Sequence, residues 1–295
     1  MNTKLRSMLF VPADSERKLA KSLGSPADVL ILDLEDSVAD SRKSVAIGMA
    51  AEFIAAHAGK IGPALYVRIN PLDTGLTMAD LAGVTVPGLA GIMLPKTFTV
   101  ADIVQVGHGL DALEARAGLA AGSVRIVPVA TETPQAVLQM HGYAQTPLAR
   151  LAGITWGAED LSSAIGAVAN KDEDGNWSPL YTWANSLCLA AAAAAGVPAI
   201  DTLHADFKDS AGLAAACRAS RRRGFRGRIA IHPDQVETIN RCFSPSDEDV
   251  AEARKVVAAF AANPELGTIG IDGKMFDIPH LKAAHKTLAA AGESA

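Results

Sequence analysis

Short apolar runs alternate with longer amphipathic stretches over the first 233 residues of the chain. The apolar runs are rich in Val, Ile and Leu, as strands are, and cover residues 7–12, 28–34, 64–69, 88–96, 123–130, 150–156, 197–203 and 227–233. Because they are mostly continuous rather than alternating, they suit parallel strands that are buried on both faces. The pattern therefore predicts eight parallel strands.

The stretches between the strands predict helices. They cover residues 41–57, 101–117, 134–145, 180–195 and 210–222, and a shorter helix is expected to begin at Ser15 as its N-cap. Eight strand–helix repeats predict an α/β fold of the (β/α)8 barrel type, whose usual length is about 250 residues. An open doubly wound sheet is the rival fold, but no GxGxxG or P-loop sequence follows any predicted strand.

The pattern changes after His232. Residues 246–261 predict a helix capped by Ser246, residues 267–277 a small hairpin and residues 279–291 a final helix. We assign residues 1–243 to the catalytic barrel and residues 244–295 to a C-terminal extension of helices and a hairpin. Such a short extension is expected to lack a core of its own and to pack on the barrel or an adjacent subunit, which favours a homo-oligomer.

Composition and charge exclude several classes of protein. The formal net charge of −5 gives no electrostatic support for nucleic-acid binding. The three cysteines lack CxxC spacing and predict neither a disulfide framework nor a zinc site. The N-terminal apolar run is too short for a signal peptide, and Pro198 and Asp201 interrupt the most apolar helical stretch, so we expect no membrane span and a cytoplasmic location.

Ionisable side chains gather where the predicted strands end. In a (β/α)8 barrel the carboxyl ends of the strands form the mouth of the active site. Exposure of the loops to solvent explains one charged strand end well, but explains poorly why five or more of the eight ends carry charge. The residues at the strand ends are Pro12 with Asp14, Glu35 and Asp36, Arg68 with the polar Asn70, Lys96, Glu132, Glu159 and Asp160, Asp201 with His204, and His232.

The acidic members of this set fit a divalent cation. Glu132 and one of Glu159 or Asp160 could supply two ligands to Mg²⁺, with substrate completing the shell. The spacing does not choose between the neighbours 159 and 160, because adjacent strand residues point to opposite sides. Arg68 could bind a carboxylate or stabilise an oxyanion, and it could equally form a buried ion pair with Glu35 or Asp36.

The remaining basic residues leave alternatives open. Lys96 could serve as a Schiff-base amine, but the surrounding acids favour its protonated form. His204 and His232 could be general bases or hydrogen-bonded structural histidines.

Nine motifs also resemble those of a known family, in the same order along residues 6–288. They are RSMLFVPADSERKLAKS, LILDLEDSV, LYVRIN with LDTGL, IMLPK, ETP, GAEDLS, GVPAIDT, IHPDQ and DGKMFDIPH. The chain thus resembles the citrate lyase β-subunit-like family of the HpcH/HpaI aldolase superfamily. The resemblance implies a barrel of the phosphoenolpyruvate/pyruvate type that binds Mg²⁺, or Mn²⁺ in its place.

The resemblance also implies roles for residues of this chain. Glu132 and Asp160 are placed like the metal ligands, and Arg68 like the residue that binds substrate and thioester oxygen. Glu35 and Asp36 resemble a second layer of acids. The substrate-binding candidates are therefore Glu35, Asp36, Arg68, Asn70 and Glu132.

Two further groups follow from the resemblance alone. Arg17, Lys18 and Lys21 are placed like residues that meet the phosphates of CoA. Asp277 resembles an acid that some members insert from an adjacent subunit as a catalytic base. The catalytic candidates are Arg68, Glu132 and Asp277.

The implied activity is Mg²⁺-dependent, reversible Claisen-type cleavage of 3-hydroxyacyl-CoA thioesters such as malyl-, citramalyl- or citryl-CoA. One alternative is a CoA-independent class II aldolase of hydroxy-oxo acids, which would need a histidine base such as His204. Another is a citrate lyase β subunit that works only with partner subunits. The resemblance further implies a homo-oligomer that is a trimer or a multiple of one.

Overall fold

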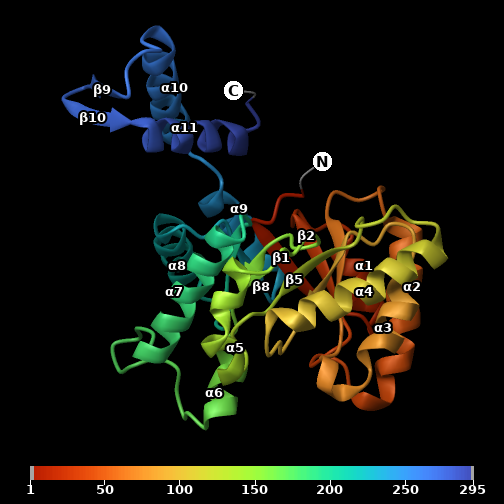
Figure 1. The fold of residues 1–295 in the computed structure, drawn as a ribbon. Helices are drawn as coiled ribbons and strands as arrows, with labels where there is room; N and C mark the ends of the chain where they lie inside the picture. Colours follow the sequence, from red (N-terminus) through yellow and green to blue (C-terminus); the bar gives the residue numbers. More distant parts are fainter. Residues whose placement is uncertain (1–2, 294–295) are drawn as a thin grey trace. The chain divides into compact units, whose positions relative to one another are not determined.

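The computed structural model describes residues 3–293, and its first unit is a closed parallel barrel (Figure 1). Hydrogen bonds connect the strands in the order β5-β4-β3-β2-β1-β8-β7-β6. Parallel bridges Ile126↔Leu151 and Val129↔Thr155 join the two ends of this series and close the ring. The predicted (β/α)8 barrel is confirmed. Its strands are β1 (Ser7–Pro12), β2 (Val29–Asp33), β3 (Ala64–Arg68), β4 (Gly91–Leu94), β5 (Arg125–Pro128), β6 (Ile154–Thr155), β7 (Ala199–Asp201) and β8 (Gly227–Ala230).

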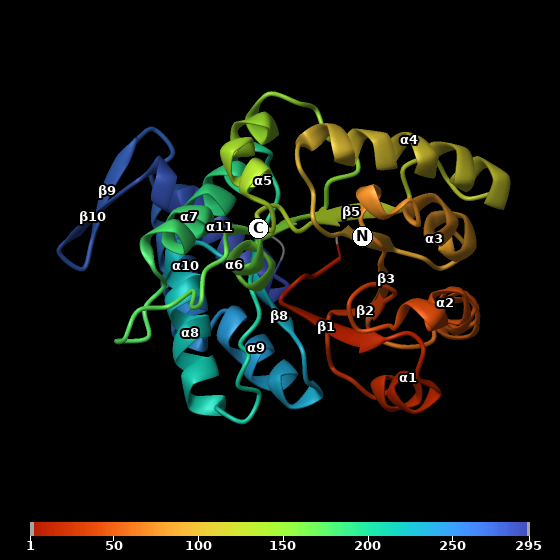
Figure 2. The same ribbon diagram turned by 90° about the horizontal axis from the view of Figure 1, so that it is seen from below.

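Helices surround these strands, as the view from below shows (Figure 2). They are α1 (Glu16–Ser22), α2 (Lys43–His57), α3 (Thr77–Val84), α4 (Val100–Ala117), α5 (Pro134–Leu138), α6 (Glu159–Ile165), α7 (Pro179–Ala194), α8 (Ser210–Arg223) and α9 (Val236–Phe243). None of the helices in residues 3–293 is long and apolar enough to cross a membrane.

Local differences from the sequence-based expectation concern the less regular segments. The strand expected at 150–156 pairs with β7 only at Ile154 and Thr155. The helix expected at 134–145 breaks into α5 and a 3-10 helix, Met140–Ala144, which contains Gly142, a weak helix former. Helices α3, α6 and α9 were not expected, because Thr77–Val84, Glu159–Ile165 and Val236–Phe243 are only seven or eight residues long.

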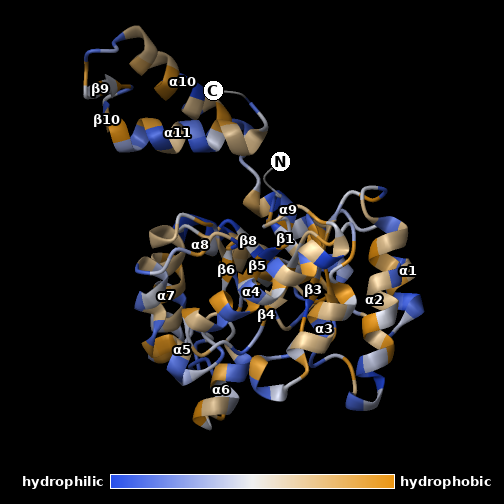
Figure 3. Cartoon of the chain, turned by 45° about the vertical axis from the view of Figure 1, so that its right-hand side comes forward, coloured by the Kyte–Doolittle hydropathy of each residue, from blue (hydrophilic) through white to orange (hydrophobic). Residues whose placement is uncertain are grey.

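Large apolar side chains fill the barrel interior. Met8, Tyr66, Met93 and Ile200 are 0–1% exposed and belong to one core cluster. Figure 3 shows hydrophobic residues gathered on the strands. Polar residues that face inward must therefore lie near the strand ends, where they can reach a ligand.

A buried ion cluster ties α4 to the segment that closes the barrel. Glu114 accepts hydrogen bonds from Arg150 at 2.6 and 2.7 Å and from the backbone amides of Gly122 and Val124 at 2.8 and 2.7 Å. Burial disfavours the charged carboxylate, but these hydrogen bonds outweigh burial and lower the pKa of Glu114 to about 2.

Replacing Glu114 with glutamine is expected to lower the free energy of unfolding by about 3 kcal/mol at pH 7. The native pKa lies below the ordinary value of 4.5, so this stabilisation is complete above pH 4.5 and is lost as the pH falls toward 2. Urea unfolding should therefore show a smaller deficit at pH 3 than at pH 7. Glu52→Gln, at an exposed position of α2, is the control. A deficit that does not change with pH would contradict the assignment.

The residues from Arg241 onward form a second compact unit, and those up to Asn240 form the first. The second unit contains α10 (Asp247–Ala262), β9 (Thr268–Ile271), β10 (Lys274–Asp277) and α11 (Ile278–Ala291), with β9 and β10 paired as an antiparallel hairpin. The expected helices and hairpin are thus present.

The expectation that this extension lacks a core of its own is wrong. Val256, Phe260 and Leu288 are buried in a cluster with two alanines, and Ile269 and Phe276 of the hairpin pack against it. The reason is that α10 and α11 both carry hydrophobic residues on one side and hydrophilic ones on the other (Figure 3), so that they bury their apolar faces against each other.

Candidate active site at the carboxyl ends of the barrel strands

Arg68 is held in place by two carboxylates. It is the last residue of β3 and lies in register with Asp33, the last residue of β2, so both side chains lie on the same side of the sheet. Its Nε and Nη2 donate to the two oxygens of Asp33 at 2.7 and 2.8 Å, and its Nη1 lies 2.9 Å from Glu35. The guanidinium also lies over the ring of Phe10, 4.4 Å from its centroid.

These contacts fix the charge states of Arg68 and Asp33. Burial opposes ionisation of Asp33, but the hydrogen bonds and charge of Arg68 outweigh it and lower the pKa of that carboxyl group. Burial likewise opposes the charge of Arg68, and Asp33 and Glu35 raise its pKa. A fixed, permanently charged guanidinium results. The sequence indicated Glu35 as a partner but missed Asp33.

Lys96 contacts four carboxylates. Its backbone N donates to Oε2 of Glu132 at 2.6 Å, and its Nζ bonds Glu35 and lies 3.0 Å from Asp36 and 3.4 Å from Asp160. Its φ of 48° lies in the left-handed region, which only a few per cent of non-glycine residues adopt. Burial alone would lower the pKa of Lys96, but the carboxylates outweigh burial and the net pKa is raised. The amine is therefore protonated and unsuited to Schiff-base chemistry.

Glu132 and Asp160 lie at the same small cavity. Glu132 follows β5 and is 5% exposed, whereas Asp160 lies in the first turn of α6. The cavity has a volume of about 80 Å³, and Arg68, Phe10 and Thr155 also line it. Burial and the nearby charge of Asp160 raise the pKa of Glu132 to about 8. Two carboxylates that repel each other, one of them buried, are suited to a cation.

Asp160 and its neighbour Glu159 differ in their contacts. Asp160 faces Lys96 and acts electrostatically on Glu132. Glu159 also lines the cavity, but its side chain accepts a hydrogen bond from Asn170 at 3.0 Å and is exposed. The geometry therefore favours Asp160 over Glu159 as the partner of Glu132.

Glu132 and Asp160 could together hold a hard divalent cation such as Mg²⁺, which prefers oxygen donors. In the described part of the chain, no group of three or more His, Cys, Asp or Glu side chains is arranged to hold a metal. Two carboxylates fill only part of the six-oxygen shell of Mg²⁺, so water or substrate oxygens would complete it.

A larger cavity of about 600 Å³ adjoins the first. Phe10, Arg68 and Leu203 line both. Arg17, Lys18 and Lys21, on α1, line the larger one. The structure thus brings the three predicted phosphate-binding residues to the same cavity as Arg68.

Asn70 lies elsewhere. It is 2% exposed, and its backbone N and side-chain amide both donate to Asp80 at 2.7 Å, while the amide also donates to the carbonyl of Leu34. It lines neither cavity. Its observed contacts hold the loop after β3 against the turn after β2.

The two candidate histidines occupy different places. His232 lines the larger cavity and stacks on Phe207 with ring centroids 4.6 Å apart. His204 lines neither cavity, its Nε2 lies 3.5 Å from Asp209, and burial lowers its pKa. His204 is thus not placed beside Glu132 and Asp160 as a general base would be.

Asp277 belongs to the second unit. It is the N-cap of α11, accepts a hydrogen bond from the backbone N of His280 and pairs with the His280 ring. The hydrogen bond from His280 lowers the pKa of Asp277. In these contacts Asp277 is a capping residue and a weak base.

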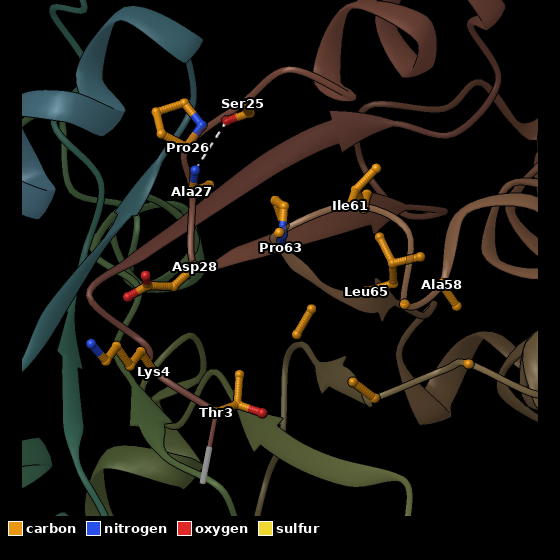
Figure 4. A pocket seen from close by; sticks show the side chains of 15 residues that line it. Thr3, Lys4, Ser25, Pro26, Ala27, Asp28, Ala58, Ile61, Pro63 and Leu65 are labelled. Carbon is orange, nitrogen blue, oxygen red and sulfur yellow. Dashed lines mark hydrogen bonds between the residues drawn. The ribbon is translucent and has the colours of Figure 1, made fainter. Parts of the chain in front are cut away.

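A further cavity of about 590 Å³ lies at the amino ends of the strands (Figure 4). Its only ionisable lining residues in the described chain are Lys4 and Asp28, and Arg6 binds Asp28 through Nε and Nη2 at 2.9 and 2.7 Å. This end of the barrel therefore lacks the converging charges of the other end.

Comparisons with known proteins agree with this geometry. The HpcH/HpaI aldolase/citrate lyase family model matches residues 6–233. The chain is 34% identical over 292 residues to the (3S)-malyl-CoA thioesterase of Cereibacter sphaeroides, covering 97% of this chain and 94% of that one. It is 31% identical over 291 residues to citrate lyase subunit beta of Haemophilus influenzae, covering 96% and 95%.

A solved structure is also similar to this chain over nearly its whole length. CitE of Mycobacterium tuberculosis, in complex with magnesium, acetoacetate and coenzyme A, superposes with a TM-score of 0.76 at 30% identity, covering 99% of this chain and 100% of that one. The family model covers most of the chain, and the relatives match it over almost its whole length, so the chain belongs to the HpcH/HpaI aldolase/citrate lyase family.

Proposed function

We propose that this protein is a Mg²⁺-dependent carbon–carbon lyase that cleaves and forms 3-hydroxyacyl-CoA thioesters. The observation that carries the proposal is the pairing of buried Glu132 with partly exposed Asp160 beside Arg68, at the junction of a small cavity with a basic one. The relatives in the family act on malyl-CoA or belong to citrate lyase, and the M. tuberculosis structure contains magnesium and coenzyme A.

The residues present fit the metal. Glu132 and Asp160 would hold Mg²⁺, or Mn²⁺ in its place, because burial and the nearby carboxylate of Asp160 both oppose ionisation of Glu132, and a cation would offset both. Glu35 and Asp36 would form a second acidic layer, held by Lys96. When bound, the ion supplies a Lewis acid for the oxygens of the 2-oxo acid or its adduct.

Arg68 would stabilise the charge that develops on the thioester oxygen. In the cleavage direction, a base takes the proton of the 3-hydroxyl group, the bond between C2 and C3 breaks, and its electron pair forms the thioester enolate. Carbon C3 becomes the oxo carbon of the 2-oxo acid, and C2 then takes up a proton. A guanidinium already fixed by Asp33 and Glu35 needs little reorganisation to meet the enolate oxygen.

We assign CoA binding to the basic cavity and proton transfer to the second unit. Arg17, Lys18 and Lys21 would contact the CoA phosphates. Asp277 would act as the base after insertion from an adjacent subunit, and this requires a homo-oligomer, for which a trimer or its multiple is expected. Analytical ultracentrifugation tests the oligomeric state.

The test of the function is a product assay. The purified full-length protein with Mg²⁺ is given malyl-, citramalyl- and citryl-CoA, and acyl-CoA, 2-oxo acid and free CoA are measured separately. Acyl-CoA with 2-oxo acid in equal amounts is the expected result. Release of free CoA without 2-oxo acid would indicate a thioesterase instead, and no turnover of any thioester would refute the proposal.

Two alternatives have distinct signatures. A CoA-independent class II aldolase would cleave hydroxy-oxo acids without retention on immobilised CoA, and the position of His204 outside both cavities disfavours it. A citrate lyase β subunit would copurify with its acyl-carrier and transferase partners and be inactive alone.

Replacing Lys96 with methionine is expected to tighten Mg²⁺ binding about tenfold, because it removes a positive charge 3.4 Å from Asp160. Isothermal titration calorimetry on the two proteins measures the change, and Lys60→Met, at an exposed site, is the control. Weaker binding by the variant would mean that Lys96 mainly holds the ligands in position.

A further inference from the structure

Arg125 is a barrel-facing cation at the amino ends of the strands. It is the first residue of β5 and lies two positions before Val127, which belongs to the cluster that fills the barrel interior, so the strand turns both side chains inward. Arg125 is in register with Gly91 of β4, and Gly91 is in register with Tyr66 of β3, so Tyr66 shares that inner side. This row across three neighbouring strands brings a guanidinium and a phenol together at the end opposite Arg68.

The middle position of the row requires glycine. A Cβ atom at Gly91 would lie 2.6 Å from Cζ of Tyr66 and 2.8 Å from the carbonyl oxygen of Arg125, closer than Cβ atoms approach other atoms. The Tyr66 ring therefore lies over Gly91, toward β5. Burial raises the pKa of Tyr66 to about 12, although the charge of Arg125 acts to lower it. The phenol is thus a protonated hydrogen-bond donor at neutral pH.

Arg125 also differs from the other arginines of the barrel strands. Arg68 and Arg228 each bond a buried carboxylate. Arg125 instead donates to the backbone carbonyl groups of Ala149 and Leu151 at 2.9 and 2.8 Å, and no carboxylate in the described part of the chain pairs with it. These bonds use two of the five N–H donors of a guanidinium. A half-buried cation with free donors and no acidic partner favours an anion.

Both groups line a cavity of about 490 Å³, a volume suited to a small molecule. Among residues 3–293, no acidic side chain lines it. Leu5, Val197 and Pro198 are among its apolar lining residues. Thr3 lines both this cavity and the neighbouring one in Figure 4. The hydroxyl of Tyr66 forms no hydrogen bond within the described residues, so its donor is free for a ligand.

We propose that this cavity is a second binding site, separate from the candidate active site, and that it takes a small aliphatic carboxylate. Arg125 and the hydroxyl of Tyr66 donate to the carboxylate, and the apolar wall covers the aliphatic part. A single cation balances a carboxylate but only part of the charge of a phosphate dianion. The site is independent of the lyase function, because Arg125 lines neither of the cavities that contain Arg68.

Calorimetry on the full-length protein, with Mg²⁺ removed by a chelator, tests the site with isovalerate as the probe. Isovaleramide, which has the same shape and no charge, is expected to bind at least about tenfold more weakly. Arg125→Met should weaken isovalerate binding at least about tenfold, and Tyr66→Phe about three- to tenfold, because one hydrogen bond is lost. Tighter binding of inorganic phosphate than of isovalerate would overturn the assignment to a carboxylate.

Two control variants make the same chemical changes elsewhere. Arg116→Met removes an exposed arginine of α4 that also donates to a backbone carbonyl group, and Tyr181→Phe removes a phenol on α7. Both should keep the isovalerate affinity within about twofold. Tyr66→Phe removes no hydrogen bond within the described chain, so it tests the site even if Arg125→Met, which loses two bonds to carbonyl groups, fails to fold.

A variant at the other end of the barrel locates the bound carboxylate. Arg68→Lys should leave isovalerate binding within about twofold of the unchanged protein. Weaker binding by Arg68→Lys together with unchanged binding by Tyr66→Phe would place the carboxylate at the candidate active site and refute the proposal. The absence of binding at about 10 mM isovalerate would refute it as well.

Discussion

Replacing Asp160 with asparagine is expected to weaken Mg²⁺ binding and to reduce kcat/KM about 100- to 1,000-fold. The change keeps the size of the side chain and removes one of the two carboxylates proposed to hold the ion. It also removes the repulsion that helps to raise the pKa of Glu132. Calorimetric titration with Mg²⁺ and steady-state kinetics with the preferred thioester measure the two effects.

The neighbouring residue provides the control. Glu159→Gln makes the same chemical change one position away, on a side chain that bonds Asn170 at the exposed side of α6. Its Mg²⁺ affinity and kcat/KM should stay within about twofold of the unchanged protein, as for a surface substitution. Equal losses in the two variants, or full activity in Asp160→Asn, would remove Asp160 from the metal site.

The sequence is sufficient to predict the barrel because the pattern of an apolar strand followed by a helix or loop is repeated eight times. Continuous apolar strands and intervening helices each follow from local patterns, and the charged strand ends then identify one mouth of the barrel. The strand ends alone therefore predict that Glu35, Arg68 and Glu132 lie close together. It could not choose between Glu159 and Asp160, because that choice depends on how the first turn of α6 is oriented.

Other features depend on contacts that no local pattern encodes. Asp33 ends the buried run of β2, so the sequence groups it with the apolar strand, although its register with Arg68 places both side chains on one side of the sheet. The core of the second unit was missed because it forms between helices separated by a hairpin. Its position at the end of β3 predicts that Asn70 belongs to the substrate site, but its side-chain amide donates a hydrogen bond to Asp80 instead.

Replacing Asp33 with asparagine is expected to lower kcat about 10- to 100-fold while leaving Mg²⁺ affinity unchanged. Asp33 lies behind Arg68 and fixes its guanidinium through two hydrogen bonds, so the variant would keep the cation but lose its orientation. The matched control is Asp28→Asn, because Asp28 binds Arg6 in the same two-pronged way at the opposite end of the barrel. It should destabilise the fold similarly without reducing kcat of the folded enzyme.

A double-mutant cycle separates positioning from general damage. Arg68→Lys is expected to lower kcat by about 100- to 1,000-fold, since lysine keeps the charge but cannot match the carboxylates and the thioester oxygen together. If Asp33 acts only through Arg68, adding Asp33→Asn to Arg68→Lys should reduce kcat by less than about threefold more, because residues that act as a unit are non-additive. Multiplicative losses would mean that Asp33 contributes independently, and rates equal to the unchanged protein in Arg68→Lys would exclude Arg68 from oxyanion stabilisation.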